Sequence, residues 1–382
     1  MRTAPRASAG QFQRALGSAG NLACESRLSD AYRMNFTCLI ALVRCGFEPD
    51  AVQELNAWLQ PRAPSVVATF EAPGVVLLRG SAPMLARAWE AWRDWRCEAA
   101  LVREFLAGVV ELAALPRGQR VEVLLAAWPD AWQVQTVELL APDSEAGRLL
   151  APMLRAVQRA LHSALSARFV ASASASAYAL FLTSERCILA LAVPGKSAPV
   201  LGGIPRLKFP AQAPSRSTLK LDEAFLTLLD ERERGLWLRP GMRAVDLGAA
   251  PGGWTYQLVR RGIHVVAIDN GALAGSLLSS GLVTHLREDG FRYAPKKPVD
   301  WLVCDMVEKP LKVAELAAHW FKAKYCRHAV VNLKLPMKRR VEELQRCRAA
   351  LQSVLGARGI WRCKQLYHDR EEVTALISAA SS

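Results

Sequence analysis

Charged side chains follow several predicted strands in the second half of the chain. Asp269 and Asp289 come after two of these strands, and Asp305 and Lys334 close the next two. Because the carboxyl ends of parallel strands meet at one edge of a sheet, we expect these side chains to converge there, where a binding site is expected. For Lys334, the alternative is a salt bridge with no chemical role.

A glycine-rich turn precedes these residues, in the segment 245–254 (VDLGAAPGGW), between an apolar strand and a predicted helix. The glycines allow a ligand to approach the backbone, and the helix N-terminus offers free N–H donors to an anionic group. The pattern is not Gly-x-Gly-x-x-Gly, and Pro251 suits a dinucleotide pyrophosphate poorly. An adenosyl cofactor with a carboxylate tail fits better than NAD, with Asp269 accepting from ribose hydroxyls and Asp289 from the adenine amino group. A structural turn without a ligand is the alternative.

An adenosyl cofactor with a carboxylate tail can be a methyl donor, and for such a donor the residues after Asp305 separate the possible acceptors. Enzymes that methylate exocyclic amines carry an Asn/Asp-Pro-Pro-aromatic turn at this position, whereas this chain reads Asp-Met-Val-Glu over 305–308. A pyrimidine C5 enzyme needs a nucleophilic cysteine, usually after proline, and the sequence contains no Pro-Cys pair. Cys304 lies inside the strand and is predicted to be a buried small residue. A ribose oxygen is the acceptor that remains. The six histidines show no ligand spacing, so no metal site is predicted.

Regular alternation of strands and helices beyond residue 216 positions these groups. Helices are predicted over 217–234, 253–262, 309–323 and 338–356. Strands are predicted over 242–247, 263–269, 299–305, 328–334, 359–367 and 373–378, with shorter ones near 283 and 291. This order predicts a Rossmann-like α/β fold, with a doubly wound, mostly parallel sheet and its site at the carboxyl ends of the strands.

The first half of the chain is predicted to be an α+β region. Its first elements, in the order βαββα, fit a ferredoxin-like split βαβ arrangement and span 37–44, 48–60, 65–70, 75–79 and 81–96. A second set comprises a strand at 132–139, a helix at 145–166 and strands near 177–183 and 187–193. Trp89, Trp92 and Trp95 are spaced for a packed helix face, which we favour over stacking on RNA bases.

Composition divides the chain into four segments. Residues 1–33 are arginine-rich without hydrophobic period and are predicted to be a flexible tail, with Met34 as the hypothetical true start. Residues 194–215 hold five prolines and three glycines, which is typical of a linker. The predicted domains are therefore 34–193 and 216–382.

Charge and cysteine usage limit the protein class. The 382 residues carry a formal net charge of +14, of which residues 1–200 contribute +3 and residues 201–382 contribute +11. Such a basic half is typical of a protein with a polyanionic partner, most often nucleic acid, and a merely soluble basic surface is the alternative that charge alone leaves open. The longest apolar runs are about eight residues, too short to cross a membrane. The nine cysteines are odd in number and never spaced Cys-x-x-Cys, which predicts reduced thiols and a cytoplasmic protein.

Six segments together resemble the ribosomal RNA large subunit methyltransferase M family, whose members carry an FtsJ-like methyltransferase domain. They are PRLKFP at 205–210, SRSTLKLDEAF at 215–225, the turn with Trp254-Thr255-Tyr256, DMVEKP at 305–310, NLKLPMK at 332–338 and LYHDREEVT at 366–374. The resemblance covers roughly residues 34–380. It implies 2′-O-methylation of a cytidine in 23S rRNA that depends on S-adenosyl-L-methionine, and a front region containing a THUMP RNA-binding domain.

The resemblance also assigns residues. FtsJ-like enzymes carry a Lys-Asp-Lys-Glu tetrad, matched here by Lys220, Asp305, Lys334 and Glu372. Glu372 is chosen over Glu371 because it directly precedes the Val-Thr strand. The positions that match the family's cofactor contacts are Ser217, Ala250, Pro251, Gly252, Gly253, Asp269, Asp289 and Asp305.

The chemistry of ribose methylation predicts different roles for the four residues of the tetrad. A ribose hydroxyl ionises far above neutral pH, so transfer needs a base placed on its proton. We expect Lys334 to be that base, with Asp305 and Glu372 orienting it and compensating charge. The basic run 338–340 is expected either to contact RNA phosphates or to be a solvated helix start.

The expected protein is a cytoplasmic, monomeric rRNA methyltransferase that acts on 23S rRNA in naked or early-assembly form. A non-catalytic RNA-binding ribosome assembly factor on the same fold is the alternative, and a small-molecule methyltransferase is a third.

Overall fold

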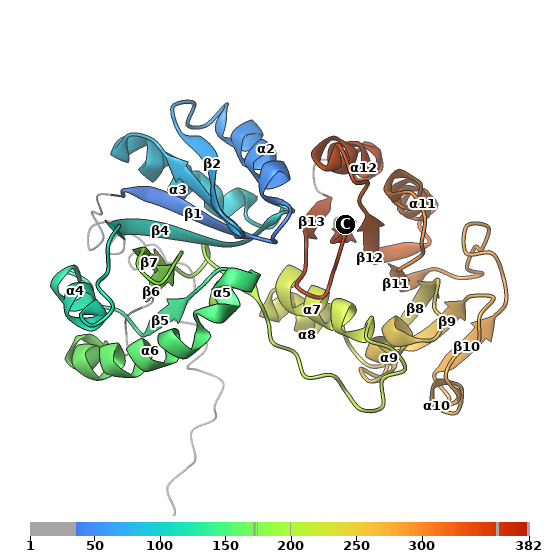
Figure 1. Ribbon diagram of the computed structural model, residues 1–382. Helices are drawn as coiled ribbons and strands as arrows, with labels where there is room; N and C mark the ends of the chain where they lie inside the picture. Colours follow the sequence, from blue (N-terminus) through green and yellow to red (C-terminus); the bar gives the residue numbers. More distant parts are fainter. Residues whose placement is uncertain (1–35, 171–172, 174, 199, 357–358, 380–382) are drawn as a thin grey trace, which may run out of the picture.

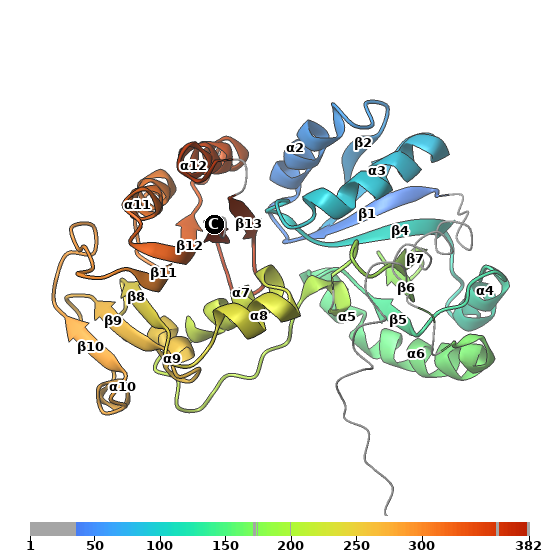
Figure 2. The same cartoon turned by 180° about the vertical axis from the view of Figure 1, so that it is seen from behind.

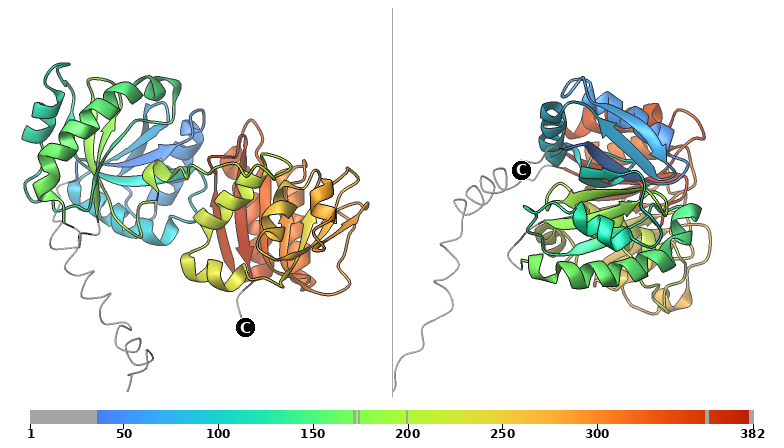
Figure 3. Two further views of the ribbon diagram at one scale, coloured as in Figure 1. Left: turned by 90° about the horizontal axis from the view of Figure 1, so that it is seen from below. Right: turned by 60° about the vertical axis from the view of Figure 1, so that its left-hand side comes forward.

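Two seven-stranded sheets, one in each half of the chain, organise the computed structural model (Figure 1). The structure describes residues 36–170, 173, 175–198, 200–356 and 359–379. The predicted tail 1–33 and the proposed start at Met34 lie outside these residues. Seen from below, the two sheets with their helices form two lobes side by side (Figure 3).

The front sheet has the strand order β2-β3-β1-β4-β7-β6-β5. Its first half confirms the predicted strand, helix, hairpin and helix, which are β1 (Cys38–Val43), α2 (Glu48–Leu59), β2 (Val67–Ala72), β3 (Val75–Arg79) and α3 (Ala82–Trp95). The prediction missed β4 (Val102–Leu112), which pairs with β1 on one side and β7 (Cys187–Ala192) on the other. Its first seven residues are all buried, so no two-residue alternation marks it as a strand.

The helices of the front half cover this sheet. Two elements of the second set, the strand expected at 132–139 and the helix expected at 145–166, differ from the prediction. Trp89 and Trp92 of α3 are buried, as the packed-face interpretation predicts. The strand expected at 132–139 is shorter, because Trp132 packs edge to face with Trp128 in the core before the strand begins. The helix expected over 145–166 is interrupted at Leu150. The elements are α4 (Arg120–Ala126), β5 (Val137–Leu140), α5 (Glu145–Leu149), α6 (Ala151–Leu165) and β6 (Ser176–Phe181).

The second sheet has the order β10-β9-β8-β11-β12-β14-β13 and confirms the doubly wound, mostly parallel prediction. Five strands are parallel, and a terminal antiparallel hairpin completes the sheet. The strands are β8 (Arg243–Leu247), β9 (His264–Ile268), β10 (Val283–Leu286), β11 (Val299–Cys304), β12 (Cys326–Lys334), β13 (Ile360–Lys364) and β14 (Glu372–Ser378). The strand expected near 291 is absent from this part of the chain, where Asp289 instead accepts the backbone N–H of Phe291 in a turn.

Helices flank both faces of the second sheet (Figure 2). The predicted helix 217–234 is divided at Leu229, because the Asp230 side chain caps a new helix together with Glu233. One face is covered by α7 (Thr218–Leu228), α8 (Glu231–Trp237) and α9 (Gly253–Val259), and the other by α11 (Pro310–Lys322) and α12 (Arg340–Leu355); α10 (Gly275–Leu278) lies beside β10. No helix among the described residues is long and apolar enough to span a membrane.

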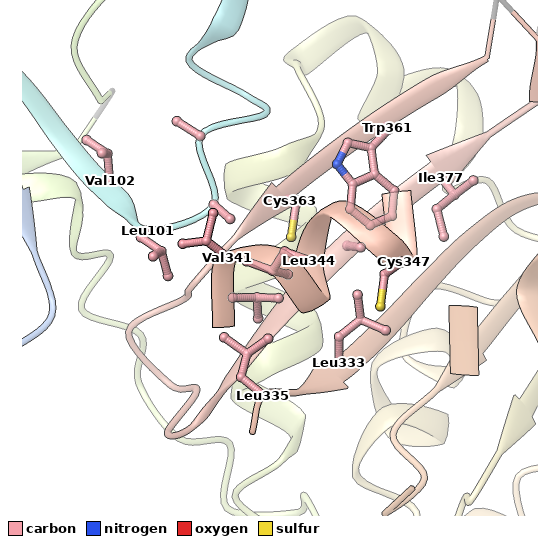
Figure 4. Close-up of a cluster of buried hydrophobic side chains, with 14 of the residues drawn as sticks. Leu101, Val102, Leu333, Leu335, Val341, Leu344, Cys347, Trp361, Cys363 and Ile377 are labelled. Carbon is pink, nitrogen blue, oxygen red and sulfur yellow. The ribbon is translucent and has the colours of Figure 1, made fainter. Parts of the chain in front are cut away.

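The two halves are joined by main-chain hydrogen bonds and a shared apolar cluster. The N–H groups of Cys363 and Gln365 donate to the carbonyls of Cys97 and Ala100, at 2.9 and 2.6 Å. Leu101 and Val102 of the front half lie in one cluster with α12 and β13 side chains (Figure 4). The front half is therefore docked on the edge of the second sheet, beside the segment that leads to Glu372.

Candidate active site

Four of the predicted site residues meet at the carboxyl edge of the second sheet. Lys334 ends β12, and Asp305 follows β11, the neighbouring parallel strand. Glu372 begins β14 and is the register partner of Lys334 in the antiparallel β12–β14 pair. Lys220 reaches the same point from the first turn of α7. Residues separated by up to 152 positions thus form one cluster.

Asp305 is the centre of this cluster. Its Oδ1 accepts from the Lys334 ammonium at 3.4 Å, and its Oδ2 lies 3.9 Å from Lys220 Nζ. Lys220 Nζ also donates to Glu372 Oε1. Glu371, the other candidate acid, points to Arg340 instead and leaves 65% of its side chain exposed. Lys220, Asp305, Lys334 and Glu372 therefore make one contiguous chain of charges.

Two opposing effects set the ionisation of Lys220 and Glu372. Burial lowers the pKa of Lys220, but the charges of Asp305 and Glu372 outweigh it and raise the pKa. Burial also raises the pKa of Glu372, but the Lys220 hydrogen bond and the charges of Lys220 and Lys334 outweigh it and lower the pKa. The Lys220–Glu372 pair is therefore ionised at neutral pH. Lys334 is the more exposed lysine, with 28% of its side chain accessible against 14% for Lys220.

Asn332 is a site residue that the sequence analysis did not assign. It is fully buried and donates from Nδ2 to Asp305 Oδ1 at 2.7 Å, a shorter contact than that of Lys334. Its position two residues before Lys334 places both side chains on the same face of β12. That spacing was the available signal. Asn332 fixes the carboxylate that Lys334 contacts.

The glycine-rich turn lies next to this cluster, between β8 and α9. Gly248 has a φ of +77°, and a Cβ there would lie 2.7 Å from Met306 Cγ. A Cβ at Gly253 would overlap the Ser217 hydroxyl at the start of α7. The turn therefore packs tightly between the start of α7 and Met306, the residue that follows Asp305. This packing places the predicted residues 250–253 and Ser217 together, and it requires glycine at both positions.

Asp246 links β8 to α9, the two elements that flank the turn, and was also not assigned from the sequence. It is completely buried in β8, where Thr255 Oγ1 donates to its Oδ2 at 2.6 Å. Its Oδ1 has no hydrogen-bond partner among the described residues. Burial is the main reason that its pKa is raised to about 7. An acidic residue within an apolar strand was the signal for it.

Asp269 and Asp289 occupy the adjoining part of the edge. Asp269 accepts the N–H groups of Ala250 and Gly271, at 3.0 and 2.7 Å, and so ties the end of β9 to the turn. Asp289 leaves 54% of its side chain exposed and accepts the backbone N–H of Phe291, an exposed residue. Two carboxylates at the strand ends beside the turn, together with the exposed residue Phe291, fit an adenosyl cofactor. The described residues include no group of three His, Cys, Asp or Glu side chains that could hold a metal ion.

The predicted basic run 338–340 divides in two. Lys338 and Arg339 are exposed. Arg340 instead pairs with Asp50 and Glu371, at 2.8 and 3.0 Å, and its guanidinium lies over the Phe47 ring. It therefore joins the two halves, and the expectation that it binds phosphate or is solvated is wrong.

A cleft of about 670 Å³ opens onto the cluster from the side of the front half. Lys220, Lys334 and Glu372 line the wall that the second half of the chain contributes, together with Ser217. Front-half residues complete it, so the candidate site is built by both halves.

Comparison with known proteins identifies similar sequences that cover most of the chain. The model of the FtsJ-like methyltransferase family matches residues 213–381. Ribosomal RNA large subunit methyltransferase M of Stenotrophomonas maltophilia strain R551-3 is 42% identical over 346 residues, which are 89% of this chain and 96% of the relative. The protein of the same name from Methylococcus capsulatus is 45% identical over 350 residues, 90% of this chain and 98% of the relative.

Solved structures are less similar. The fibrillarin pre-rRNA processing protein of Methanococcus jannaschii has a TM-score of 0.31 at 14% identity, covering 38% of this chain and 70% of that chain. The identity and coverage of the relatives confirm the resemblance found in the sequence, and the chain belongs to the ribosomal RNA large subunit methyltransferase M family.

Proposed function

We propose that the protein transfers a methyl group from S-adenosyl-L-methionine to the 2′-oxygen of a cytidine ribose in 23S rRNA. The observation that carries this proposal is the cluster of Lys334, Asp305, Lys220 and Glu372 beside the glycine-rich turn. The names of the relatives support large-subunit rRNA as the substrate. The cytidine and the ribose oxygen come from the family resemblance.

Lys334 is the proposed general base. S-adenosyl-L-methionine, when bound, supplies an electrophilic methyl group on a sulfonium. Lys334 would take the hydroxyl proton as the 2′-oxygen accepts that methyl group and the sulfur leaves as a neutral thioether. Asp305 then holds the ammonium that forms, through the contact it makes with Lys334 at 3.4 Å. Release of this proton to water restores the base.

We assign Lys220 and Glu372 to holding Asp305 in position beside Lys334. Their ion pair balances the charge around Asp305 without joining the proton transfer, because Lys220 is held by both carboxylates. Of the two lysines beside Asp305, Lys334 has the more exposed side chain. This difference supports Lys334, rather than Lys220, as the group that meets the substrate.

The glycine-rich turn and the two strand-end acids are the proposed cofactor site. Residues 250–253 would approach the methionine part, together with Ser217, which lies against Gly253. Asp269 would take the ribose hydroxyls and Asp289 the adenine amino group. Asp305 would contact both the cofactor and Lys334.

The remaining assignments follow from this function. Residues 34–193 are the proposed ferredoxin-like and THUMP region for RNA binding, 194–215 the linker and 216–382 the methyltransferase domain. The substrate is 23S rRNA in naked or early-assembly form, and the protein acts as a monomer in the cytoplasm.

Mapping of ribose methylation in 23S rRNA tests the function. rRNA from a strain that lacks the protein should lose one 2′-O-methyl group, detected by mass spectrometry of nuclease fragments. Purified protein with S-adenosyl-L-methionine should restore it. An unchanged methylation map would favour the non-catalytic assembly factor, against which the complete tetrad argues.

A further inference from the structure

Four arginines line the cleft in front of the candidate active site. Arg44 and Arg148 come from the front half, and Arg216 and Arg370 from the methyltransferase half. Arg148 belongs to α5, and Arg216 lies just before α7. The cleft thus carries positive charge on both walls, and Lys220 and Lys334 add two more cations.

The acidic residues of the cleft do not neutralise these arginines. Asp143 pairs with the buried Arg103, and Glu372 pairs with Lys220. Asp369 is buried and accepts from Thr374 and from the N–H of Leu366. Each carboxylate is therefore already engaged by a group other than the four arginines.

The arginine side chains themselves have few partners. Within the described part of the chain, the guanidinium groups of Arg148, Arg216 and Arg370 make no hydrogen bond or ion pair. Arg44 donates only to the carbonyl of Tyr367, at 3.3 Å. The cleft therefore has an excess of cationic donors that face open space.

The two walls are held at a fixed separation. Arg103 of β4 reaches the carbonyls of Gln365 and Leu366, both at 3.4 Å. Glu223 of α7 accepts the N–H groups of Tyr367 and His368, at 2.7 and 3.0 Å. The segment that carries Arg370 is thus anchored from both halves, and the cleft is a preformed site.

We propose that Arg44, Arg148, Arg216 and Arg370 form a clamp for the phosphodiester groups that flank the target ribose. The inference rests on the proposed function and adds the residues that hold the RNA strand. Planar guanidinium groups bind phosphate oxygens in pairs of hydrogen bonds, and each neutralised phosphate releases counterions. Lys334 lines the same cleft, and we expect the clamp to hold a single RNA strand there, with a phosphate on either side of the ribose.

The position of the clamp distinguishes it from a binding site for the cofactor carboxylate. The glycine-rich turn lies between β8 and α9, whereas Arg44 and Arg148 belong to the other half of the molecule. Both walls are needed to hold the strand, so the methyltransferase half alone supplies only two of the four arginines.

A double variant, Arg148→Gln/Arg370→Gln, tests the clamp in the full-length protein. It removes one exposed guanidinium from each wall without breaking a described contact. The matched control is Arg117→Gln/Arg327→Gln, which changes one exposed arginine of each half, with 84% and 79% of the side chains accessible. The readouts are the KM for a 23S rRNA fragment, its salt dependence, and the Kd of S-adenosyl-L-methionine.

The clamp predicts a KM for RNA about tenfold higher in the double variant. The logarithmic salt slope should fall by about 1.4, since each single-strand phosphate contact contributes about 0.7. The cofactor Kd and the control variant should match the wild type. An equal effect in the control, an unchanged KM and slope, or weaker cofactor binding would each overturn the clamp. Failure of the wild-type protein to methylate the RNA would instead refute the proposed function.

Discussion

Lys334 and Glu372 are register partners, at the end of a parallel strand and the start of an antiparallel one. The acid of the tetrad therefore comes from the terminal hairpin, and not from the parallel part of the sheet that carries the turn, Asp305 and Lys334. Lys220 completes the cluster by donating to Glu372 from α7. The site depends on docking a C-terminal strand against β12 in one register.

The Lys220–Glu372 pair makes stability depend on pH. The pKa of Glu372 is lowered in the folded state, so its contribution is present above the unfolded value of about 4.3 and is lost as pH falls through the folded pKa. The pKa of Lys220 is raised, so its contribution is lost only as pH rises through that pKa, above about 10.4. Glu372→Gln should therefore lower the Tm between about pH 5 and 10, and much less below pH 4.

Glu371→Gln is the matched control for Glu372→Gln, because Glu371 is the adjacent residue and its side chain is largely exposed. Its effect on the Tm should be small throughout, since the Glu371 side chain is largely exposed and Arg340 keeps its 2.8 Å pair with Asp50. Thermal unfolding followed by circular dichroism gives both comparisons. A Glu372→Gln deficit of the same size at pH 3.5 and pH 7 would contradict the ion pair.

Asn332 should be required for the rate rather than for cofactor binding. Asn332→Ala removes the 2.7 Å hydrogen bond that fixes Asp305, and we expect kcat to fall about 10- to 100-fold. Asn332→Asp should be worse, because it places a second carboxylate beside Asp305. Steady-state methyl transfer and the cofactor Kd of each variant separate the two effects. Wild-type kcat in Asn332→Ala would refute this role.

Gly248 should be intolerant of any side chain. Its φ of +77° and the closeness of Met306 make Gly248→Ala strained, at a cost of about 1–3 kcal/mol. Because the strain falls in the turn, S-adenosyl-L-methionine binding, measured by calorimetry, should weaken. Gly275→Ala is the control, since an added Cβ there meets nothing within 4 Å. Equal binding by both variants would show that the turn does not touch the cofactor.

The second sheet could be predicted because its determinants are local. Apolar strands alternate with amphipathic helices, and strand-end positions identify Asp305 and Lys334 without knowledge of their neighbours. The same reasoning missed β4, since a strand buried on both faces has no alternating pattern. It also joined α7 and α8, because the cap at Asp230 interrupts a continuous run of helix-forming residues.

Other features depend on contacts between distant parts of the chain. Cys97 and Cys363 meet through their backbones, which no spacing in the sequence indicates. Arg340 is one of three consecutive basic residues, yet only it meets Asp50 and Phe47 of the front half. The cleft that contains the arginine clamp exists only because of this docking.

The general base is the central claim, and Lys334→Ala tests it most directly. Transfer of a labelled methyl group to 23S rRNA should fall by about 10² to 10⁴-fold in kcat, while the cofactor Kd stays at the wild-type value. Lys312→Ala, at an exposed lysine of α11, should keep full activity. In the wild-type reaction, the label should remain in an alkali-resistant dinucleotide, because a 2′-O-methyl group blocks attack of the 2′-oxygen on the adjacent phosphate. Near wild-type transfer by Lys334→Ala, or label on a base, would contradict the account.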